Sequence, residues 1–238
     1  MEKIITYKNL RSFAYVNDRL IQGQIKGVVL NFFGLGGMPI YDDSDESAKY
    51  YAQKNILYVV AYNNPWSWMN PQAIAYTDEI LDVLFEHYAL LNEMPIVFTG
   101  FSMGGMAALV YTHYAKHTPK ACVVNCPVCD MPYHFTERAD LPRTIYSAYF
   151  WENGSLQEVL RRFSPLHLAE TMPDIAYYVF HCDQDQAVNK EKHSDRFVKA
   201  MSNHRIAYYE VEGRGHCDLG EEAAVQFSRC ILEELNAE

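Results

Sequence analysis

The chain has 238 residues, of which 49% are hydrophobic and 21% are charged. This balance excludes a disordered chain and favours one soluble globular domain. Its formal net charge of -10 at pH 7 is not offset by a local basic stripe, so phosphate backbones would be repelled and we expect no nucleic-acid partner.

The N-terminal residues 1–16 carry several charges, among them Glu2, Lys3, Lys8 and Arg11, and contain no continuous apolar stretch. They therefore do not resemble a secretory signal. No later apolar run has the length needed to cross a bilayer. We expect a cytoplasmic protein with no membrane partner, whose six cysteines stay reduced.

Short apolar runs alternate with longer segments of helical period, a pattern that predicts a parallel sheet covered by helices. Residues 4–24 come first and predict an antiparallel edge. The predicted parallel strands are 28–33, 56–62, 96–99, 121–125, 175–180 and 206–211. The predicted helices are 44–54, 71–91, 103–116, 191–202 and 221–235.

The segment 71–91 has the clearest helical period. Its apolar residues recur at spacings that place them on one face, and they are Ile74, Leu81, Leu84, Tyr88 and Leu91. Pro71 suits the first turn of this helix, and Pro95 marks the break before the next strand.

The alternation of strands and helices stops between residues 126 and 165, where Pro127, Pro132 and Pro142 interrupt an aromatic-rich stretch. We therefore predict a single domain, residues 1–238, with a cap-like insertion at about 126–165 over one end of the sheet. Its aromatic side chains favour an apolar or sugar-stacking ligand.

The segment Gly100-Phe101-Ser102-Met103-Gly104 matches G-x-S-x-G between a predicted strand and a predicted helix. A nucleophile elbow needs this context, because the sharp turn holds the serine hydroxyl out from the sheet. A Cβ at residue 100 or 104 would collide with neighbouring backbone. We predict Ser102 as a nucleophile, and the alternative is an ordinary tight turn with a capping serine.

From about residue 28 to the C-terminus the chain resembles the α/β-hydrolase family, and most of all its small esterases and its prolyl-oligopeptidase-like and dienelactone-hydrolase-like catalytic domains. The resemblance implies an α/β class with the α/β-hydrolase fold, a mostly parallel sheet with helices on both faces and a small inserted cap. It also implies an oxyanion hole from the N–H groups of Leu35 and Met103, although Phe33 stands where the family often has histidine.

The resemblance places a catalytic acid after the next-to-last strand and a base after the last one. Residues 181–188 resemble the family's H-G-x-x-D-x-x-V segment, which selects Asp185 and leaves Asp183 as the alternative. Among the nine histidines, His216 alone lies in a glycine-rich loop after the last predicted strand. The order Ser102, Asp185, His216 is the order of α/β-hydrolases.

Two tryptophans, Trp66 and Trp68, follow the second parallel strand and should lie at the same sheet edge as Ser102. With Phe101 in the elbow they are candidate substrate-binding residues, and plain packing of the loop is the alternative.

A histidine pair and a cysteine group come next in the helix and strand that follow the elbow, at His113, His117, Cys122, Cys126 and Cys129. Their spacing fits no structural zinc pattern, so we predict no metal site.

These residues predict a serine carboxylesterase that forms an acyl-enzyme and needs no metal or organic cofactor. The expected partner is a small-molecule ester, and homo-oligomer formation is left open. The alternatives are a serine peptidase of prolyl-oligopeptidase type and a catalytically inactive binding protein on the same fold.

Overall fold

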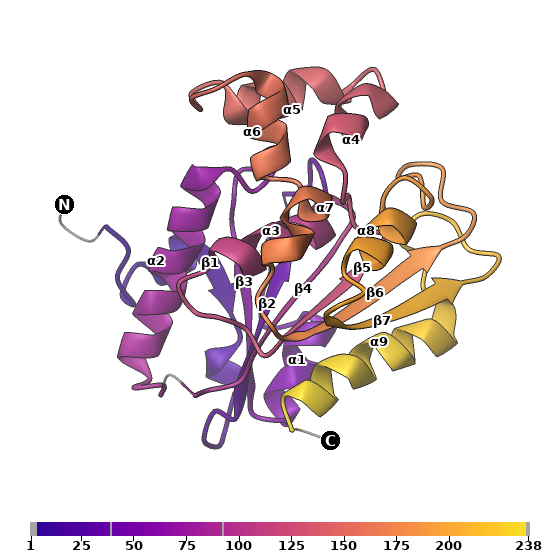
Figure 1. Ribbon diagram of the computed structural model, residues 1–238. Helices are drawn as coiled ribbons and strands as arrows, with labels where there is room; N and C mark the ends of the chain where they lie inside the picture. The colour runs from indigo at the N-terminus through magenta and orange to yellow at the C-terminus, as the bar shows by residue number, and fades with distance from the viewer. Residues whose placement is uncertain (1–3, 39, 92, 237–238) are drawn as a thin grey trace.

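The computed structural model describes residues 4–38, 40–91 and 93–236, so Glu2 and Lys3 of the N-terminal segment lie outside the described residues. Within this part of the chain a seven-stranded sheet has the order β1-β3-β2-β4-β5-β6-β7. Helices cover both of its faces (Figure 1). The predicted fold class, a mostly parallel sheet between helices, is confirmed.

Six strands run parallel to their neighbours, and β1 pairs with β3 in the antiparallel sense. The strands are β1 Ala14–Val16, β2 Gly27–Phe32, β3 Ile56–Ala61, β4 Ile96–Phe101, β5 Ala121–Asn125, β6 Ala176–Cys182 and β7 Arg205–Val211. Each predicted parallel strand overlaps an observed one, and β1 lies inside the segment predicted as an antiparallel edge.

Helices occupy the connections between these strands. They are α1 Glu46–Gln53, α2 Pro71–His87, α3 Met103–Tyr114, α4 Met131–Glu137, α5 Leu141–Tyr149, α6 Leu156–Arg162, α7 Pro165–Leu168, α8 Ser194–Ala200 and α9 Gly220–Glu234. Three short 3-10 turns add η1 Leu10–Ser12, η2 Asp18–Leu20 and η3 Ala169–Thr171. In the described part of the chain, none of the helices is both long and apolar enough to span a bilayer.

Helix α2 begins as predicted but ends one turn early. The Asn70 side chain accepts a hydrogen bond from Ala73 N at 3.0 Å, which caps the first turn. The helix stops at His87, and Ala89 has φ of 49°. Leu91 therefore leaves the helix and is 70% exposed, so the prediction that it shares the apolar face is wrong.

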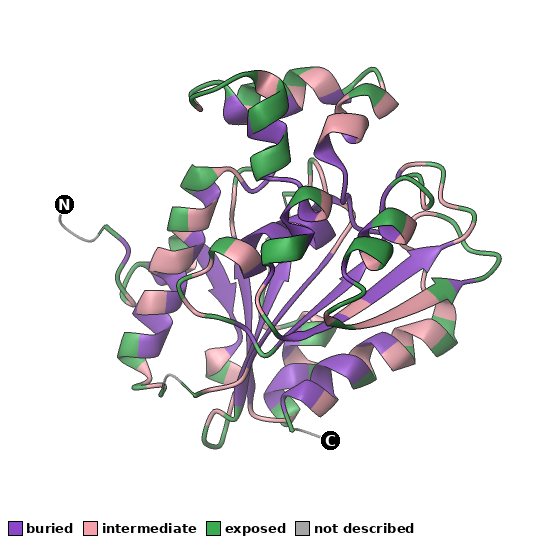
Figure 2. Cartoon of the chain, viewed as in Figure 1, coloured by how far each residue is buried: buried purple, intermediate pink, exposed green. Residues whose placement is uncertain are grey.

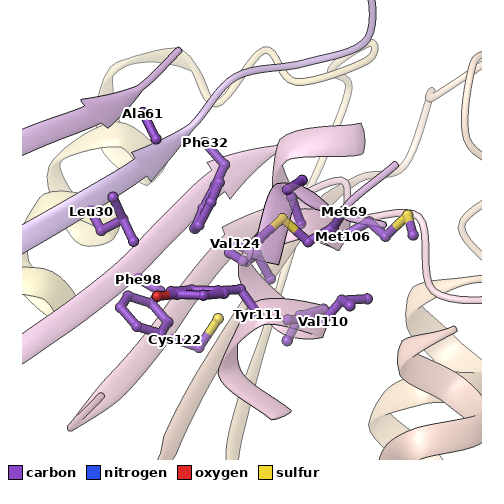
Figure 3. Packing of buried hydrophobic residues seen from close by; sticks show 14 of the residues in the cluster. Leu30, Phe32, Ala61, Met69, Phe98, Met106, Val110, Tyr111, Cys122 and Val124 are labelled. Atoms are coloured by element: carbon purple, nitrogen blue, oxygen red, sulfur yellow. The ribbon is translucent and has the colours of Figure 1, made fainter. Parts of the chain in front are cut away.

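The core lies on both faces of the central strands, which are buried along their whole length (Figure 2). On one face Phe98 packs against Tyr111 of α3, with ring centroids 4.9 Å apart, and Met106 of the same helix lies beside Val124 of β5 (Figure 3). On the other face the residues of α1 and α9, such as Ile231, pack against the alternate side chains of the same strands, such as Val29. Strands covered on both faces have continuous apolar sequence, which is why these runs were detectable.

The insertion folds as α4, α5 and α6, which lie together at one end of the molecule, at the top of Figure 1. Polar contacts join it to the loop after β3. Trp68 Nε1 donates to Thr144 Oγ1 at 3.2 Å, and Asn70 Nδ2 donates to the Ala148 carbonyl at 2.8 Å. The Tyr149 hydroxyl also donates to the Trp68 carbonyl. These contacts hold the helices of the insertion against the edge of the sheet that carries the elbow.

Candidate active site

Ser102 stands in a sharp turn between β4 and α3. Its φ of 59° and ψ of −125° lie in a region that costs an L-residue about 1–3 kcal/mol. Two glycines make the turn possible, because a Cβ on Gly100 would overlap the backbone of Gly104, and a Cβ on Gly104 would overlap the backbone of Phe32. The predicted collisions at residues 100 and 104 are thus confirmed. The turn is anchored by a 3.0 Å hydrogen bond from Ser102 N to the Asn125 carbonyl.

Asp185 lies in the loop after β6, with a side chain that is fully buried. One carboxylate oxygen accepts from the N–H groups of Ala187 at 2.8 Å and Val188 at 2.9 Å. The other lies 2.6 Å from His216 Nδ1 and 3.3 Å from His181 Nε2. Burial alone would raise the pKa of this carboxyl, but these hydrogen bonds outweigh it and hold the pKa far below its ordinary value.

The alternative acid, Asp183, lies elsewhere in the same loop. One of its carboxylate oxygens accepts from Arg214 N at 3.3 Å, in an exposed stretch of chain. Among the described residues no hydrogen bond joins Asp183 to His216. The structure therefore brings Asp185, and not Asp183, to the candidate base.

His216 lies in the loop between β7 and α9, with 28% of its side chain exposed. Burial alone would lower its pKa, but the hydrogen bond to Asp185 and the nearby Cys126 raise the pKa to about 9. Because Nδ1 is bonded to the carboxylate, Nε2 is the nitrogen left for chemistry. It lies 3.5 Å from Cys217 Sγ.

Ser102 and His216 line one pocket of about 430 Å³. The described residues show no direct hydrogen bond between the Ser102 hydroxyl and His216 Nε2. Catalytic hydrogen bonds are often long without substrate and shorten in the complex. The missing hydrogen bond therefore does not exclude Ser102 and His216 as a catalytic pair. Both predicted oxyanion residues, Leu35 and Met103, line the same pocket.

The three candidate substrate-binding aromatics have different surroundings. Phe101 lines the pocket and stacks on Phe227 with ring centroids 5.3 Å apart. Trp68 also lines it, although the residue is almost wholly buried. Trp66 is 45% exposed and lines a separate depression beside Trp151. Of the three, Trp66 is thus the one that the structure places outside the pocket of Ser102.

The insertion contributes residues to the pocket that no sequence motif indicated. His134, in the last turn of α4, and Arg138, directly after the helix, lie on the pocket wall. His134 Nδ1 is 2.6 Å from Glu137 Oε2, and burial lowers the pKa of His134, so its ring is neutral near pH 7. Since the carboxylate can only accept, the proton is on Nδ1 and Nε2 remains a hydrogen-bond acceptor. The only hint in the sequence was that His134 and Glu137 are three residues apart, a spacing that brings two side chains together on one face of a helix.

The two histidines considered for metal binding have different surroundings. His117 Nε2 is 2.9 Å from Asp82 Oδ1, and His113 lies partly buried on α3. In the described segments of the chain, no group of three closely spaced ligand atoms includes either histidine.

Comparison with known proteins is informative at the level of structure. No family model matches the chain, and no curated protein matches its sequence. A puromycin hydrolase superposes with a TM-score of 0.71 at 18% identity, over 90% of this chain and 35% of that one. This chain thus spans about a third of that protein.

Two further matches extend over most of both chains. An S-formylglutathione hydrolase from Agrobacterium tumefaciens has a TM-score of 0.69 at 16% identity, over 94% of this chain and 88% of that one. Est1E from Butyrivibrio proteoclasticus has a TM-score of 0.60 at 13% identity, over 94% of each chain. At sequence identities this low, these matches show that the proteins share a fold.

Proposed function

We propose that this chain, which has the α/β-hydrolase fold, is a serine hydrolase that cleaves carboxylic esters. One observation carries the proposal. Ser102, in its positive-φ turn, shares a pocket with His216, whose Nδ1 lies 2.6 Å from the buried carboxylate of Asp185. A nucleophile, a base and a group that orients the base are the parts that acyl transfer requires.

In the acylation step His216 Nε2 accepts the Ser102 proton while the serine oxygen attacks the ester carbonyl. Asp185 keeps the other imidazole nitrogen protonated and stabilises the imidazolium that forms. Its depressed pKa means that the carboxyl stays ionised throughout. The imidazolium then protonates the leaving alcohol, and a water molecule activated by the same histidine hydrolyses the acyl-enzyme.

The negative charge of the tetrahedral intermediate would be held by the N–H groups of Leu35 and Met103. Met103 is the first residue of α3, and the N–H groups of a first helical turn have no acceptor within the helix. Leu35 follows Gly34, which lies next to the Ser102 side chain. Each such donor contributes about 3–4 kcal/mol to stabilisation of the transition state.

The pocket wall favours an ester over a peptide. Trp68, Phe101 and Val128 contribute apolar surface around the candidate nucleophile. An ester needs little beyond its carbonyl to be held, whereas a peptide brings N–H and C=O groups that cost about 1–3 kcal/mol each if buried without partners. A peptidase is the second candidate, because the fold also matches a puromycin hydrolase and a dipeptidyl peptidase 4 from Porphyromonas gingivalis.

The decisive test is labelling with a fluorophosphonate, which reacts with activated serines. We expect one labelled site in the wild type, mapped to Ser102 by peptide mass, and none in Ser102→Ala. Ser147→Ala is the matched control, because Ser147 is an exposed serine of α5 outside the pocket. A folded wild-type protein that is not labelled at Ser102 would refute the enzyme hypothesis. Nitrophenyl esters run beside aminoacyl-proline amides then separate the two candidates, since cleavage of amides alone would favour the peptidase.

A further inference from the structure

Three groups of metal-ligand atoms occur in the described residues, and within each group the atoms lie within 4.8 Å of one another. They are Cys126–His216–Cys217, Cys126–His181–Asp185 and His134–Glu137–His193. A histidine binds a metal only through an unprotonated nitrogen, and its other nitrogen sets the tautomer. The hydrogen bonds of the three histidine rings therefore decide which group can hold an ion.

Two of the groups are excluded by their tautomers. His193 Nδ1 accepts from the N–H groups of Cys129 and Asp130, both at 3.0 Å, so its proton is on Nε2 and is donated to Glu137. His181 Nε2 lies 3.1 Å from the Val188 carbonyl, which can only accept, so this nitrogen is protonated as well. Neither nitrogen that faces the other ligand atoms has a free lone pair.

The third group has the opposite arrangement. His216 Nδ1 donates its proton to the Asp185 carboxylate, so Nε2 is the nitrogen on the side of the cysteines, and its lone pair is free to bind an ion whenever the ring is neutral. Zinc bonds of about 2.3 Å to sulfur and 2.0–2.1 Å to nitrogen place the two atoms about 3.6 Å apart in a tetrahedral site. Cys217 Sγ and His216 Nε2 are 3.5 Å apart. This pair could bind such an ion with little movement.

Cys126 supplies the second sulfur from the end of β5. Its Sγ accepts N–H groups from Cys182 at 3.5 Å and Cys217 at 3.4 Å. The thiol also donates to Asn125 Oδ1 at 3.3 Å, and its hydrogen bond with Cys217 and its burial raise its pKa, so an ion that binds here must displace its proton. Cys126 and Cys217 have φ of 47° and 62°, so an unusual backbone conformation presents both thiols. Cys126 is buried, whereas Cys217 and His216 line the pocket and give an ion its way in.

We propose that Cys126, His216 and Cys217 form a binding site for a zinc-class divalent ion, and that this ion switches the hydrolase off. The inhibitory part rests on the proposed function. The ion takes the Nε2 lone pair that would otherwise accept the serine proton, so metal binding and catalysis exclude each other. Asp185 orients the ring in both states, as outer carboxylates do for zinc-bound histidines. Each thiol that becomes a ligand releases its proton to solvent, and a protonated His216 ring likewise releases its Nε2 proton.

The site is tested first without reference to activity, on the full chain, reduced and freed of metal by a chelator. Cobalt(II) serves as the probe, because thiolate ligation produces a charge-transfer band in the near ultraviolet. We expect one equivalent of cobalt to generate this band, and zinc to abolish it. The band should be weakened in Cys217→Ser and in Cys126→Ser, and unchanged in Cys230→Ser, whose thiol lies on α9 outside the group.

A cobalt complex without the thiolate band, or a band that survives both Cys217→Ser and Cys126→Ser, would overturn the site. Since Cys126 is buried, its variant can fail to fold, and thermal unfolding is measured for each protein. Cys217 is half-buried, so its serine variant keeps the test available.

The inhibitory role is tested by zinc titration of ester hydrolysis, with each variant compared with its own zinc-free rate. Loss of one ligand should weaken inhibition in Cys217→Ser by more than the roughly 10- to 100-fold that loss of an outer partner costs. Fluorophosphonate labelling without a cobalt band would refute the metal site and leave the hydrolase standing. A cobalt band without labelling of the metal-free protein would support the site and refute the hydrolase together with its regulation.

Discussion

Replacing Gly104 by alanine tests whether the close approach of α3 to β2 positions the proposed nucleophile, Ser102. The added Cβ would lie 2.7 Å from Phe32 C and 2.8 Å from Phe33 O, and closer still to Phe32 O. Ordinary contacts between such atoms are about 3.5 Å, so the two backbones must separate by more than about 1 Å. Overpacking of this kind costs about 1–3 kcal/mol, against about 1 kcal/mol gained from alanine in a helix.

The matched control is Gly105→Ala, one residue further along α3. There the nearest atom to an added Cβ is Pro127 Cβ at 3.1 Å, and the helix gains the same propensity. A misplacement of about 1 Å costs on the order of 100-fold in rate, so Gly104→Ala should lower kcat/KM for a nitrophenyl ester by that factor. It should also lower Tm by a few degrees, since about 1 kcal/mol shifts Tm by 2–4 °C at this size. Equal activity in the two variants would refute the reasoning.

Three further predictions concern the carboxylates and the base. Asp185→Asn should lower kcat by about 10⁴-fold through the wrong imidazole tautomer, whereas Asp183→Asn should stay near wild type; the reverse order in steady-state assays would exchange their roles. His216 has a pKa of about 9 and accepts a proton only when neutral, so kcat/KM of the metal-free protein should rise with pH until about 9, and a flat profile from pH 6 to 9 would contradict this. Glu137→Ala leaves two buried histidine N–H groups without an acceptor and should lower the unfolding free energy by about 2–4 kcal/mol in urea, unlike Glu152→Ala, which removes a partly exposed carboxylate 3.8 Å from Arg162.

The sequence pattern was sufficient to predict most helices and strands and the nucleophile-elbow turn, because these features depend mainly on residues that are close together in the chain. The six apolar runs became the six parallel strands, and for the five inner ones the reason is that strands covered on both faces must be largely apolar; the sixth is the edge strand β7, most of whose residues are only half-buried. Gly100 and Gly104 indicated the turn around Ser102 for a similar reason, because the collisions that exclude a Cβ there lie within a few residues or on the adjoining strand. The end of α2 was misplaced, because Leu91 continues the apolar period after the backbone has left the helix.

What surrounds Ser102 was decided only by the tertiary structure. Cys126 and Cys217 are 91 residues apart in the chain, yet Cys217 N donates to Cys126 Sγ because β5 and β7 lie on either side of β6 and end at the same edge of the sheet. His134 reaches the pocket through the fold of the insertion, and the choice of Asp185 over Asp183 depends on which carboxylate the loop turns inward. Periodicity and turn chemistry act over a few residues, whereas the convergence of side chains at a sheet edge depends on strand order and loop conformation. The sequence alone therefore indicated the turn around the candidate nucleophile and named His216 and Asp185 as its candidate partners, whereas the packing of distant segments determined which carboxylate meets His216 and which other side chains line the pocket.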